Sequence, residues 1–330
     1  MSKKGCLVVT VIVIVIILML SVCGIFCVLL GSSFADYDWS TTSSENSEVL
    51  YSGGEDKIAV IFVEGVIMDS SDSSDLWGSS IASSQTITEN IDKALEDSSV
   101  KAIILNIDSP GGDVYASDVI YNKLKEAQTK GVKIVTLMKG TAASGGYYVA
   151  APSDKIVANA ITITGSIGVR MDFQSLAGLY EKLGIESRTI TNNEGEYKTG
   201  EGLFDNNPNG EEDLIMQTIV DEAYDKFIGV IVEGRKMKLG EVQEIADGRV
   251  LTGKQAKEVG LVDILGGFDE AVEAAEKEAG ITNATVISYE TYDFWSMLAG
   301  YAASVTNPTA EIAKLIDPTP GAKLRYLYSE

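Results

Sequence analysis

The stretch "VKAIILNIDSPGGDVYASDVIYNKLKEAQTKGVKIVTLM", residues 100–138, contains the unit that decides the fold. Residues 100–108 are almost continuously apolar, which is typical of a strand buried on both faces of a parallel sheet. Residues 114–128 have the apolar spacing of an amphipathic helix, and residues 132–138 are a second apolar run of strand length. A strand, a helix and a strand in this order predict a right-handed βαβ unit.

The same alternation continues on both sides of this unit. Further strands are predicted at 57–67, 155–160, 162–169, 186–191 and 284–290, and further helices at 144–151, 173–184, 209–234 and 268–280. Thr86 and Glu89 have the spacing of a capping box and predict the start of one more helix. We expect one α/β domain over residues 57–290, with a mostly parallel sheet and no internal repeat.

The longest predicted helix, residues 209–234, has apolar side chains at core spacing. These are Leu214, Val220, Ala223, Phe227 and Ile231. Because neighbouring members of this set are three, four or six residues apart, they are expected to lie along one face of a helix. We expect this whole face to pack against the domain.

The N-terminal region predicts a membrane anchor. Residues 6–30 are 25 almost wholly apolar residues, enough for one transmembrane helix across roughly 30 Å of hydrocarbon. Lys3 and Lys4 precede this span and acidic residues follow it, so the positive-inside rule places residues 1–5 in the cytoplasm. Residues 31–56 are rich in Ser, Thr and acids and are expected to form a tether. The expected location is the cytoplasmic membrane, single-pass, with the main domain extracytoplasmic.

Two other interpretations of the N-terminus are weaker. Ser33-Phe34-Ala35 resembles the cleavage site of a secretory signal peptide, but the apolar stretch is longer than the roughly 7 to 15 residues of such a peptide. Cys23 ends the sequence "LSVC", which resembles a lipidation site, but Val22 is too large for the position before the cysteine. The opposite end, residues 291–330, has a broad apolar face that packs on the domain, on a neighbouring subunit or on the bilayer surface.

The composition excludes several classes of site. The chain has no histidine, and its three cysteines, Cys6, Cys23 and Cys27, all lie in or beside the apolar span. A Ser-His-Asp triad, a disulfide framework and a zinc site with the usual ligands are therefore excluded from the main domain. We expect no cofactor and no metal. The formal net charge of −22 argues against nucleic acid as a partner.

Two glycine-rich turns are candidates for chemistry. In "DSPGGDV" (108–114), the adjacent glycines follow a buried strand, and the amide of Gly112 can point at a ligand oxygen. In "TAASGGYY" (141–148), Ser144 lies at a helix N-terminus as a candidate nucleophile, and Gly145 can donate its N–H to an oxyanion. The alternatives are a plain tight turn and a serine that only caps the helix. Position 142 is alanine, so the G-x-S-x-G motif is absent here.

A nucleophilic serine without histidine needs another base. A lysine can take this role if burial lowers its pKa from about 10.4 to near 7 or 8. Lys139, Lys155 and Lys198 are the candidates, and spacing alone does not choose among them.

The stretch 57–290 resembles the signal peptide peptidase A family in its short, membrane-anchored bacterial form. The resemblance rests on six motifs in one order: "VEGVI" (63–67), "NIDSPGGDV" (106–114), "TAASGGYYVA" (141–150), "ITGSIGV" (163–169), "YKTG" (197–200) and "ADGRVLTGKQAKEVGLVD" (246–263). It implies a Clp protease/crotonase-like fold with repeated ββα units and a serine peptidase with a Ser-Lys dyad.

The resemblance also implies roles for particular residues. Ser144 becomes the nucleophile, and Lys198 becomes the general base, with Thr199 in place of the more usual serine of that motif. Ser166, in "TGSIG", matches the serine that orients the lysine. Gly112 and Gly145 are the expected oxyanion donors.

The implied partners are cleaved signal peptides and other apolar peptides at the outer face of the membrane. The resemblance further implies a homo-oligomeric ring in which serine and lysine come from adjacent subunits. Two alternatives remain at this stage. One is a crotonase-like acyl-transfer or hydratase enzyme on the same frame, and the other is a non-catalytic assembly scaffold.

Overall fold

The computed structural model describes residues 47–70, 81–172, 177–186, 192, 211–289 and 324–327. The chain divides into two units, residues 1–46 and 47–330, and all described residues belong to the second. The predicted transmembrane segment, residues 6–30, lies outside the described residues. Among the residues that are described, no helix has the length and apolar character needed to cross a bilayer.

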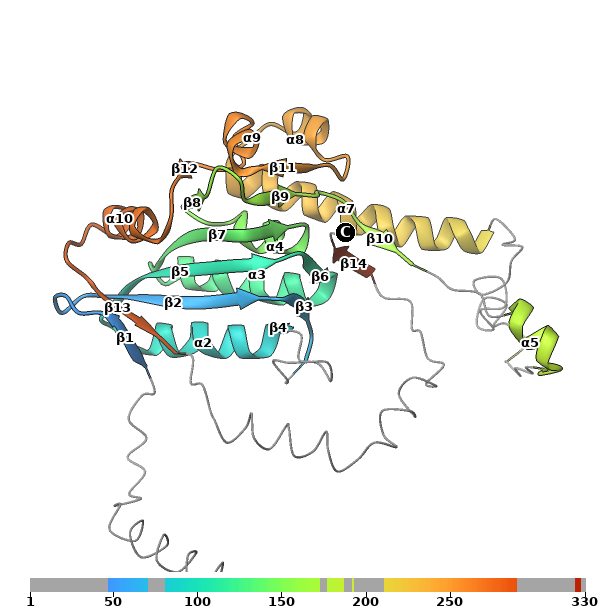
Figure 1. The fold of residues 1–330 in the computed structure, drawn as a ribbon, viewed down its shortest axis with the longest axis horizontal. Coiled ribbons are helices and arrows are strands. Elements are labelled where there is room, and N and C mark those ends of the chain that lie inside the picture. The colour runs from blue at the N-terminus through green and yellow to red at the C-terminus, as the bar shows by residue number, and fades with distance from the viewer. Residues whose placement is uncertain are drawn as a thin grey trace, which may run out of the picture. The chain divides into compact units, whose positions relative to one another are not determined.

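A mostly parallel sheet forms the centre of the second unit (Figure 1). Its strands run in the order β1-β13-β2-β5-β7-β8-β12. Their bounds are β1 Glu48–Tyr51, β2 Lys57–Glu64, β5 Val100–Ser109, β7 Lys133–Ala143, β8 Lys155–Ala158, β12 Ile264–Leu265 and β13 Thr285–Ser288. In this strand order β1 is antiparallel to its neighbour β13, and all other neighbouring strands are parallel to each other. The predicted βαβ unit of residues 100–138 is confirmed as β5, α3 (Val114–Thr129) and β7.

Two smaller groups of strands surround the carboxyl ends of the central strands. β9 (Ile163–Gly165) continues the sheet beside the last residues of β7, and β11 (Val250–Thr252) pairs antiparallel with β9. A separate sheet has the order β10-β14-β6-β3-β4. Its strands are β3 Val66–Met68, β4 Ile81–Ser83, β6 Gly111–Asp113, β10 Arg170–Met171 and β14 Leu324–Leu327.

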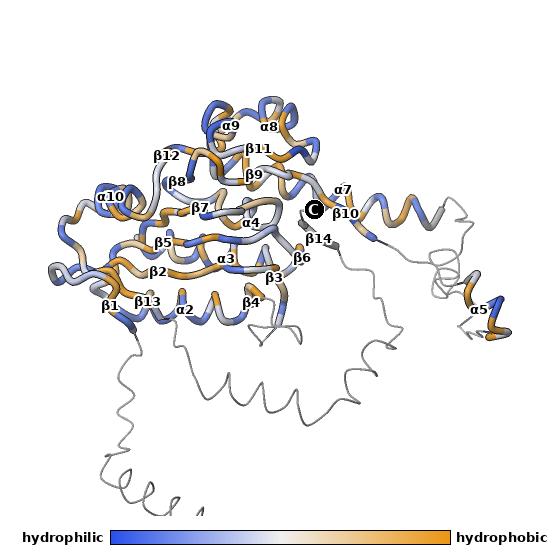
Figure 2. Tube along the Cα trace, in the orientation of Figure 1, coloured by the Kyte–Doolittle hydropathy of each residue, from blue (hydrophilic) through white to orange (hydrophobic). Residues whose placement is uncertain are grey.

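Helices cover both faces of the central sheet. On one face, α2 (Ser84–Glu96), α3 and α4 (Gly145–Ala150) pack against alternate strand residues such as Ile103, Leu105 and Ile107. On the other face, α10 (Phe268–Ala279) packs against Ile104 and its neighbours. Because successive strand side chains point to opposite faces, an apolar residue at every position is needed to fill both cores. Figure 2 shows the resulting apolar strands and the more hydrophilic outer helices.

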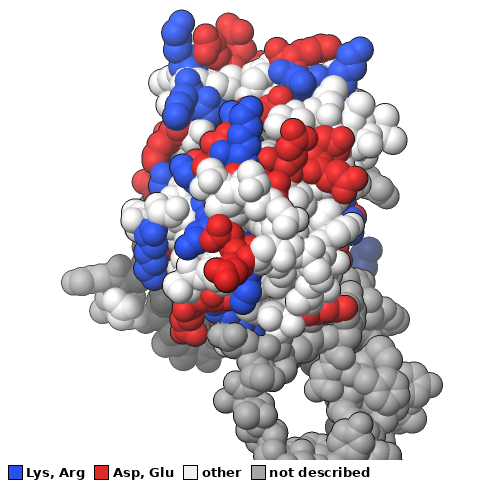
Figure 3. Space-filling model, turned by 90° about the vertical axis from the view of Figure 1, so that its left-hand side faces the viewer, with Lys and Arg blue, Asp and Glu red and all other residues white. Residues whose placement is uncertain are grey.

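The remaining helices follow β10 in the chain. They are α5 (Ala177–Leu183), α7 (Glu211–Arg235), α8 (Leu239–Ile245) and α9 (Gly253–Glu258). On the face of the molecule seen in Figure 3, basic and acidic side chains are interspersed. The formal charge of −22 therefore does not produce a single acidic patch on that face.

Several local predictions are wrong. Helix α2 begins at Ser84, and Ser83 caps it by accepting the N–H of Thr86 at 3.2 Å, because β4 ends directly before it. Thr86 therefore lies inside the first turn and is not the cap. Four residues of the predicted tether form β1, which pairs with β13.

The core assignment for the long helix holds only in its C-terminal part. Phe227 and Ile231 of α7 are fully buried, whereas the side chain of Leu214 is 67 % exposed. The first turns of α7 extend beyond the strands of the central sheet (Figure 1), so no described residue covers Leu214. The expectation that Leu214 belongs to the core is therefore wrong for this chain.

Candidate active site

Ser144 occupies a strained turn between β7 and α4. Its backbone has φ 52° and ψ −116°, a combination that a residue with a side chain rarely adopts. The residue is buried and stands at the N-cap position of α4, yet its side chain makes no cap hydrogen bond. The alternative that Ser144 only caps the helix is therefore wrong. Strain of this kind is kept where the surrounding structure fixes it, and it is concentrated at functional sites.

Ser166 is held beside Ser144 by strand pairing. β9 runs parallel to β7, with Ala143 opposite Gly165, so the two serines follow equivalent positions at the ends of neighbouring strands. The N–H of Ser144 donates to the carbonyl oxygen of Gly165 at 2.8 Å. Ser166 also has φ 52° and donates its own N–H to the carbonyl oxygen of Arg249 at 2.8 Å. The structure thus brings these two predicted site residues together.

The two predicted oxyanion glycines also lie against one another. A Cβ atom placed on Gly145 would lie 3.1 Å from the backbone nitrogen of Gly112 and 2.8 Å from Ser117 Oγ. A Cβ atom on Gly112 would lie only 2.0 Å from the carbonyl oxygen of Ile67. A side chain at either position would therefore displace backbone or close the space beside Ser144. Glycine is required here by close approach of the chain.

Polar side chains fix the strand ends that carry these glycines. Ser109 Oγ accepts the N–H of Gly111 at 3.1 Å, which holds the glycine turn. Asp108 Oδ1 accepts the N–H of Thr141 at 3.0 Å, at a point where the register of β5 and β7 shifts. Such an irregularity bends a strand and re-aims the residues that follow. Asp108 and Ser109 are part of the glycine-rich motif in the sequence. Their hydrogen bonds could not be predicted, because these depend on how β5 and β7 pair.

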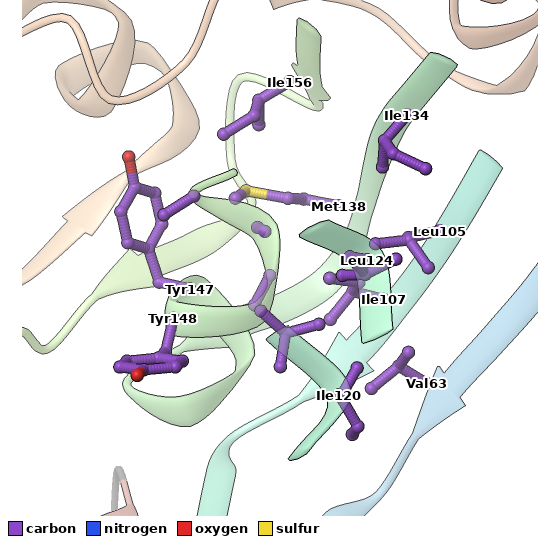
Figure 4. Close-up of a cluster of buried hydrophobic side chains, with 14 of the residues drawn as sticks. Val63, Leu105, Ile107, Ile120, Leu124, Ile134, Met138, Tyr147, Tyr148 and Ile156 are labelled. Carbon is purple, nitrogen blue, oxygen red and sulfur yellow. The ribbon is translucent and has the colours of Figure 1, made fainter. Parts of the chain in front are cut away.

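Two tyrosines after Ser144 anchor α4 in the core (Figure 4). Tyr147 is fully buried and donates its hydroxyl to the carbonyl oxygen of Leu261 at 2.9 Å, and burial raises the pKa of its phenol well above the usual value. The hydroxyl of Tyr148 donates to Asp118 Oδ1 at 2.7 Å, and Lys226 pairs with the same carboxylate at 2.7 Å. Sequence reasoning missed these anchors, although the pair "YY" beside Ser144 was a visible signal.

Of the three candidate bases, two have environments that do not suit the role. Lys155 begins β8 opposite Val135, nine residues before Ser144 on β7, which corresponds to roughly 30 Å along a strand. Lys139 is about half exposed and its Nζ lies 2.9 Å from Glu64 Oε1, so it is neither desolvated nor apart from carboxylates. Lys198 lies outside the described residues.

A strand from the far end of the chain runs beside the glycine turn. β14 pairs antiparallel with β6, with Tyr326 opposite Gly112, and β10 pairs with the other edge of β14. An extended segment is therefore accommodated directly beside a predicted oxyanion donor. The predicted C-terminal segment, residues 291–330, was expected to make a contact, but this strand within it was not predicted. Its other residues lie outside the described part of the chain.

Comparison with known proteins assigns the family. The family model for "Peptidase family S49" matches residues 126–282, and the one for "Clp protease" matches residues 80–164. A protein of Enterococcus faecium, whose name describes it as a signal peptide peptidase SppA, is 40 % identical over 249 residues. The match covers 74 % of this chain and 70 % of that protein. The chain belongs to the S49 signal peptide peptidase family.

Longer members of this family match as well. "Serine protease SPPA, chloroplastic" of Arabidopsis thaliana is 36 % identical over 271 residues, covering 80 % of this chain and 39 % of that protein. "Protease 4" of Haemophilus influenzae is 35 % identical over 221 residues, covering 67 % of this chain and 34 % of that protein. The chain is thus a serine peptidase, and its mostly parallel α/β sheet agrees with the Clp protease match. This assignment fits neither the crotonase-like acyl-transfer or hydratase enzyme nor the non-catalytic assembly scaffold.

Proposed function

We propose that this chain is a membrane-anchored endopeptidase that uses a Ser144–Lys198 dyad. Its substrates would be remnant signal peptides and other apolar peptides at the outer face of the cytoplasmic membrane. The observation that carries the proposal is the strained, buried Ser144 next to Gly112 and Gly145, in a family of serine peptidases. Residues 6–30 would be the anchor, holding the peptidase domain near peptides released into the bilayer.

The chemistry follows the general logic of a serine nucleophile and a base. The neutral amine of Lys198 takes the proton of Ser144 while Oγ attacks the carbonyl carbon of the scissile peptide bond. The backbone N–H groups of Gly112 and Gly145 donate hydrogen bonds to the oxyanion that develops. Lys198 then gives the proton to the leaving amine, and water releases the acyl group in a second step of the same kind. Ser166 would orient the lysine.

The substrate would bind as an added strand. The antiparallel pairing of β14 with β6 supports this, because it puts an extended backbone next to Gly112. Main-chain hydrogen bonds along a strand edge give affinity without regard to sequence, and pockets for alternate side chains give selectivity. Such recognition suits signal peptides, which share apolar character rather than one sequence.

The active site would be completed by an adjacent subunit in a homo-oligomeric ring. Three apolar side chains on the first turns of α7, Leu214, Ile215 and Ile219, are 67 %, 41 % and 39 % exposed. An apolar surface of this kind is typical of a contact with another protein. Assembly of this kind would also bury Lys198, as its role as a base requires.

The lysine is tested by substitution of two lysines in parallel. We expect Lys198→Ala to abolish peptide cleavage and Lys139→Ala to retain it, both measured with the full-length chain in detergent or vesicles. Wild type should gain activity from neutral to alkaline pH, whereas Lys198→Arg should stay inactive, because arginine is effectively never deprotonated. An inactive Lys139→Ala with an active Lys198→Ala would overturn the assignment.

The shared site is tested by mixing inactive subunits. Ser144→Ala and Lys198→Ala chains are each inactive, but a mixed ring would contain sites with both functional residues. Recovery of part of the wild-type activity after co-assembly supports the proposal. Absence of recovery in oligomers that contain both variants contradicts the sharing between subunits, while leaving the dyad itself to the substitution test.

A further inference from the structure

A pocket of about 300 Å³ lies on the α10 face of the central sheet. Its lining includes Asn106 of β5, Leu137 of β7 and Phe268 at the start of α10. Leu137 belongs to the buried cluster under α10, whereas Tyr147 and Tyr148 after Ser144 belong to the cluster on the opposite face. The pocket is therefore separate from the candidate active site.

Asn106 is an unusual residue for its position. Alternate residues of β5 on the same face, Ala102 and Ile104, are apolar and fully buried. Asn106 is also buried, with 6 % of its surface exposed, and in the part of the chain that the structure describes its Oδ1 has no hydrogen-bond partner. Buried acceptors are nearly always satisfied, because an unsatisfied one costs stability. An amide at this position in place of an aliphatic side chain therefore points to a donor that the described part of the chain does not supply.

Several other polar groups around the pocket already have partners. Lys139 Nζ lies 2.9 Å from Glu64 Oε1, so the ammonium charge at the pocket is balanced. The N–H of Gly267 donates to Glu270 Oε2 at 2.7 Å, and Asn159 Oδ1 accepts the N–H of Ile161 at 3.1 Å. A charged ligand would find no free counter-charge among these groups. The lining instead favours a neutral and mainly apolar ligand.

Size narrows the ligand class further. A volume of about 300 Å³ is at the lower end for ligand pockets and fits one ring system or one large side chain. We propose that this pocket binds a neutral aromatic ring with one N–H or O–H group, which donates to Asn106 Oδ1. Indole and phenol rings have this chemistry, either as free molecules or as side chains of a peptide. The ring would pack on Leu137 and Phe268.

The donor is tested with a pair of probes that differ in one group. Indole and 1-methylindole have nearly the same shape, but only indole has an N–H. We expect saturable binding of indole to the full-length wild-type chain by saturation-transfer NMR, and binding of 1-methylindole about tenfold weaker, the loss expected for one hydrogen bond. This comparison needs no variant, so it does not depend on how a substituted chain folds. Equal binding of the two probes, or no binding of indole, overturns the proposal.

The site is tested with two matched asparagines. Asn106→Leu removes the free acceptor and should weaken indole binding about tenfold, while peptide cleavage continues. Asn90→Leu is the control, since Asn90 is also buried but lies on α2, where its Oδ1 already accepts from Lys93. Asn90→Leu should leave indole binding unchanged. An Asn106→Leu chain that cleaves peptide and binds indole as tightly as wild type contradicts the assignment of the site.

A third probe distinguishes the two sources of the ring, a free small molecule and an aromatic side chain of a peptide. N-acetyl-L-tryptophanamide carries the indole ring with flanking peptide groups. If it competes with indole, the pocket accepts an aromatic side chain of a peptide. If only indole binds, the pocket takes a free small molecule. Ser144→Ala should bind all probes as wild type does, so a failure here is distinguishable from a failure of the proposed peptidase mechanism.

Discussion

The two ends of the central sheet are built differently. At the amino ends of the strands, ion pairs and ordinary hydrogen bonds tie the chain together: Lys57 pairs with Asp97 at 2.8 Å, and the carboxylate of Asp154 accepts the N–H of Ile134 at 2.9 Å. At the carboxyl ends, the backbone turns through positive φ at Ser144 and Ser166. Polar contacts stabilise both ends, but the carboxyl end also holds Ser144 and Ser166 in strained positions where chemistry is expected. Substitutions should therefore affect stability at one end and activity at the other.

The largest effect on activity should come from Ser144→Ala. Removal of a nucleophilic hydroxyl typically lowers kcat by about 10⁴-fold or more. The thermal unfolding temperature should stay close to that of wild type, because Ser144 makes no cap hydrogen bond. The measurement is cleavage of an apolar peptide together with thermal unfolding. A variant with more than a tenth of the wild-type rate would contradict the role of Ser144.

Gly145→Ala should have the next largest effect. The added Cβ would lie 2.8 Å from Ser117 Oγ and 3.1 Å from the backbone nitrogen of Gly112, so it displaces one of the two expected oxyanion donors. Loss of one donor typically lowers kcat by about 10²- to 10³-fold. Gly229→Ala on α7 is the control, since a Cβ there meets no atom within 4 Å. Similar kcat values for both variants would contradict the oxyanion assignment.

A pair of buried serines compares the two ends directly. Ser166→Ala should lower kcat by about ten- to a hundredfold, as expected for a group that orients the base, with little change in KM. The matched control is Ser153, which precedes β8 at the other end of the sheet and whose Oγ lies 2.8 Å from Thr136 Oγ1. Ser153→Ala should keep full activity and lose about 1 kcal/mol of the free energy of unfolding. A loss of activity for Ser153→Ala together with a loss of stability alone for Ser166→Ala would contradict the proposed difference between the two ends of the sheet.

The smallest expected effect is a pH dependence at the amino end. Burial alone raises the pKa of the Asp97 carboxyl, but hydrogen bonds from Lys57 and Ser99 outweigh it and lower the pKa from 3.8 to about 2. Because the pKa in the folded chain is below that of the unfolded chain, the stabilisation is present above about pH 4 and is lost as the pH falls toward 2.

Thermal unfolding of Asp97→Asn across this range measures that contribution. The variant should unfold at a lower temperature than wild type at pH 7, and the difference should narrow as the pH falls from about 4 toward 2. A constant difference for Asp97→Asn at all pH values would exclude the proposed linkage.

The sequence predicted the central architecture because the pattern there is local. Residues 100–138 carry two buried strands and an amphipathic helix whose periodicities differ, and the structure confirms all three elements. Two glycine-rich turns predicted Ser144, Gly112 and Gly145 as site residues, and the family motifs added Ser166; the structure brings these four residues close together. Their spacing in the sequence could not predict that they lie close together, because this depends on which strands pair.

Other features depended on contacts that no local pattern contains. Ser83 caps α2 because a short strand ends there, although Thr86 and Glu89 formed the more familiar cap motif. Leu214 has core spacing but lies on the part of α7 that extends past the sheet. β1 lies in the predicted tether, and β14 lies in the C-terminal segment that was expected to pack on the domain, a neighbouring subunit or the bilayer. Each forms by pairing with a strand far away in the sequence.

The chain of backbone bonds behind the two serines connects them to a surface loop. Arg249 holds Ser166 through its carbonyl oxygen, Gly165 holds Ser144 in the same way, and the side chain of Arg249 is itself clamped by Asp247. A ligand or a mutation that shifts this loop would thus move the nucleophile without touching it. A substitution at positions 247–249 is therefore expected to change the rate of cleavage, although these positions lie about 100 residues after Ser144 in the sequence.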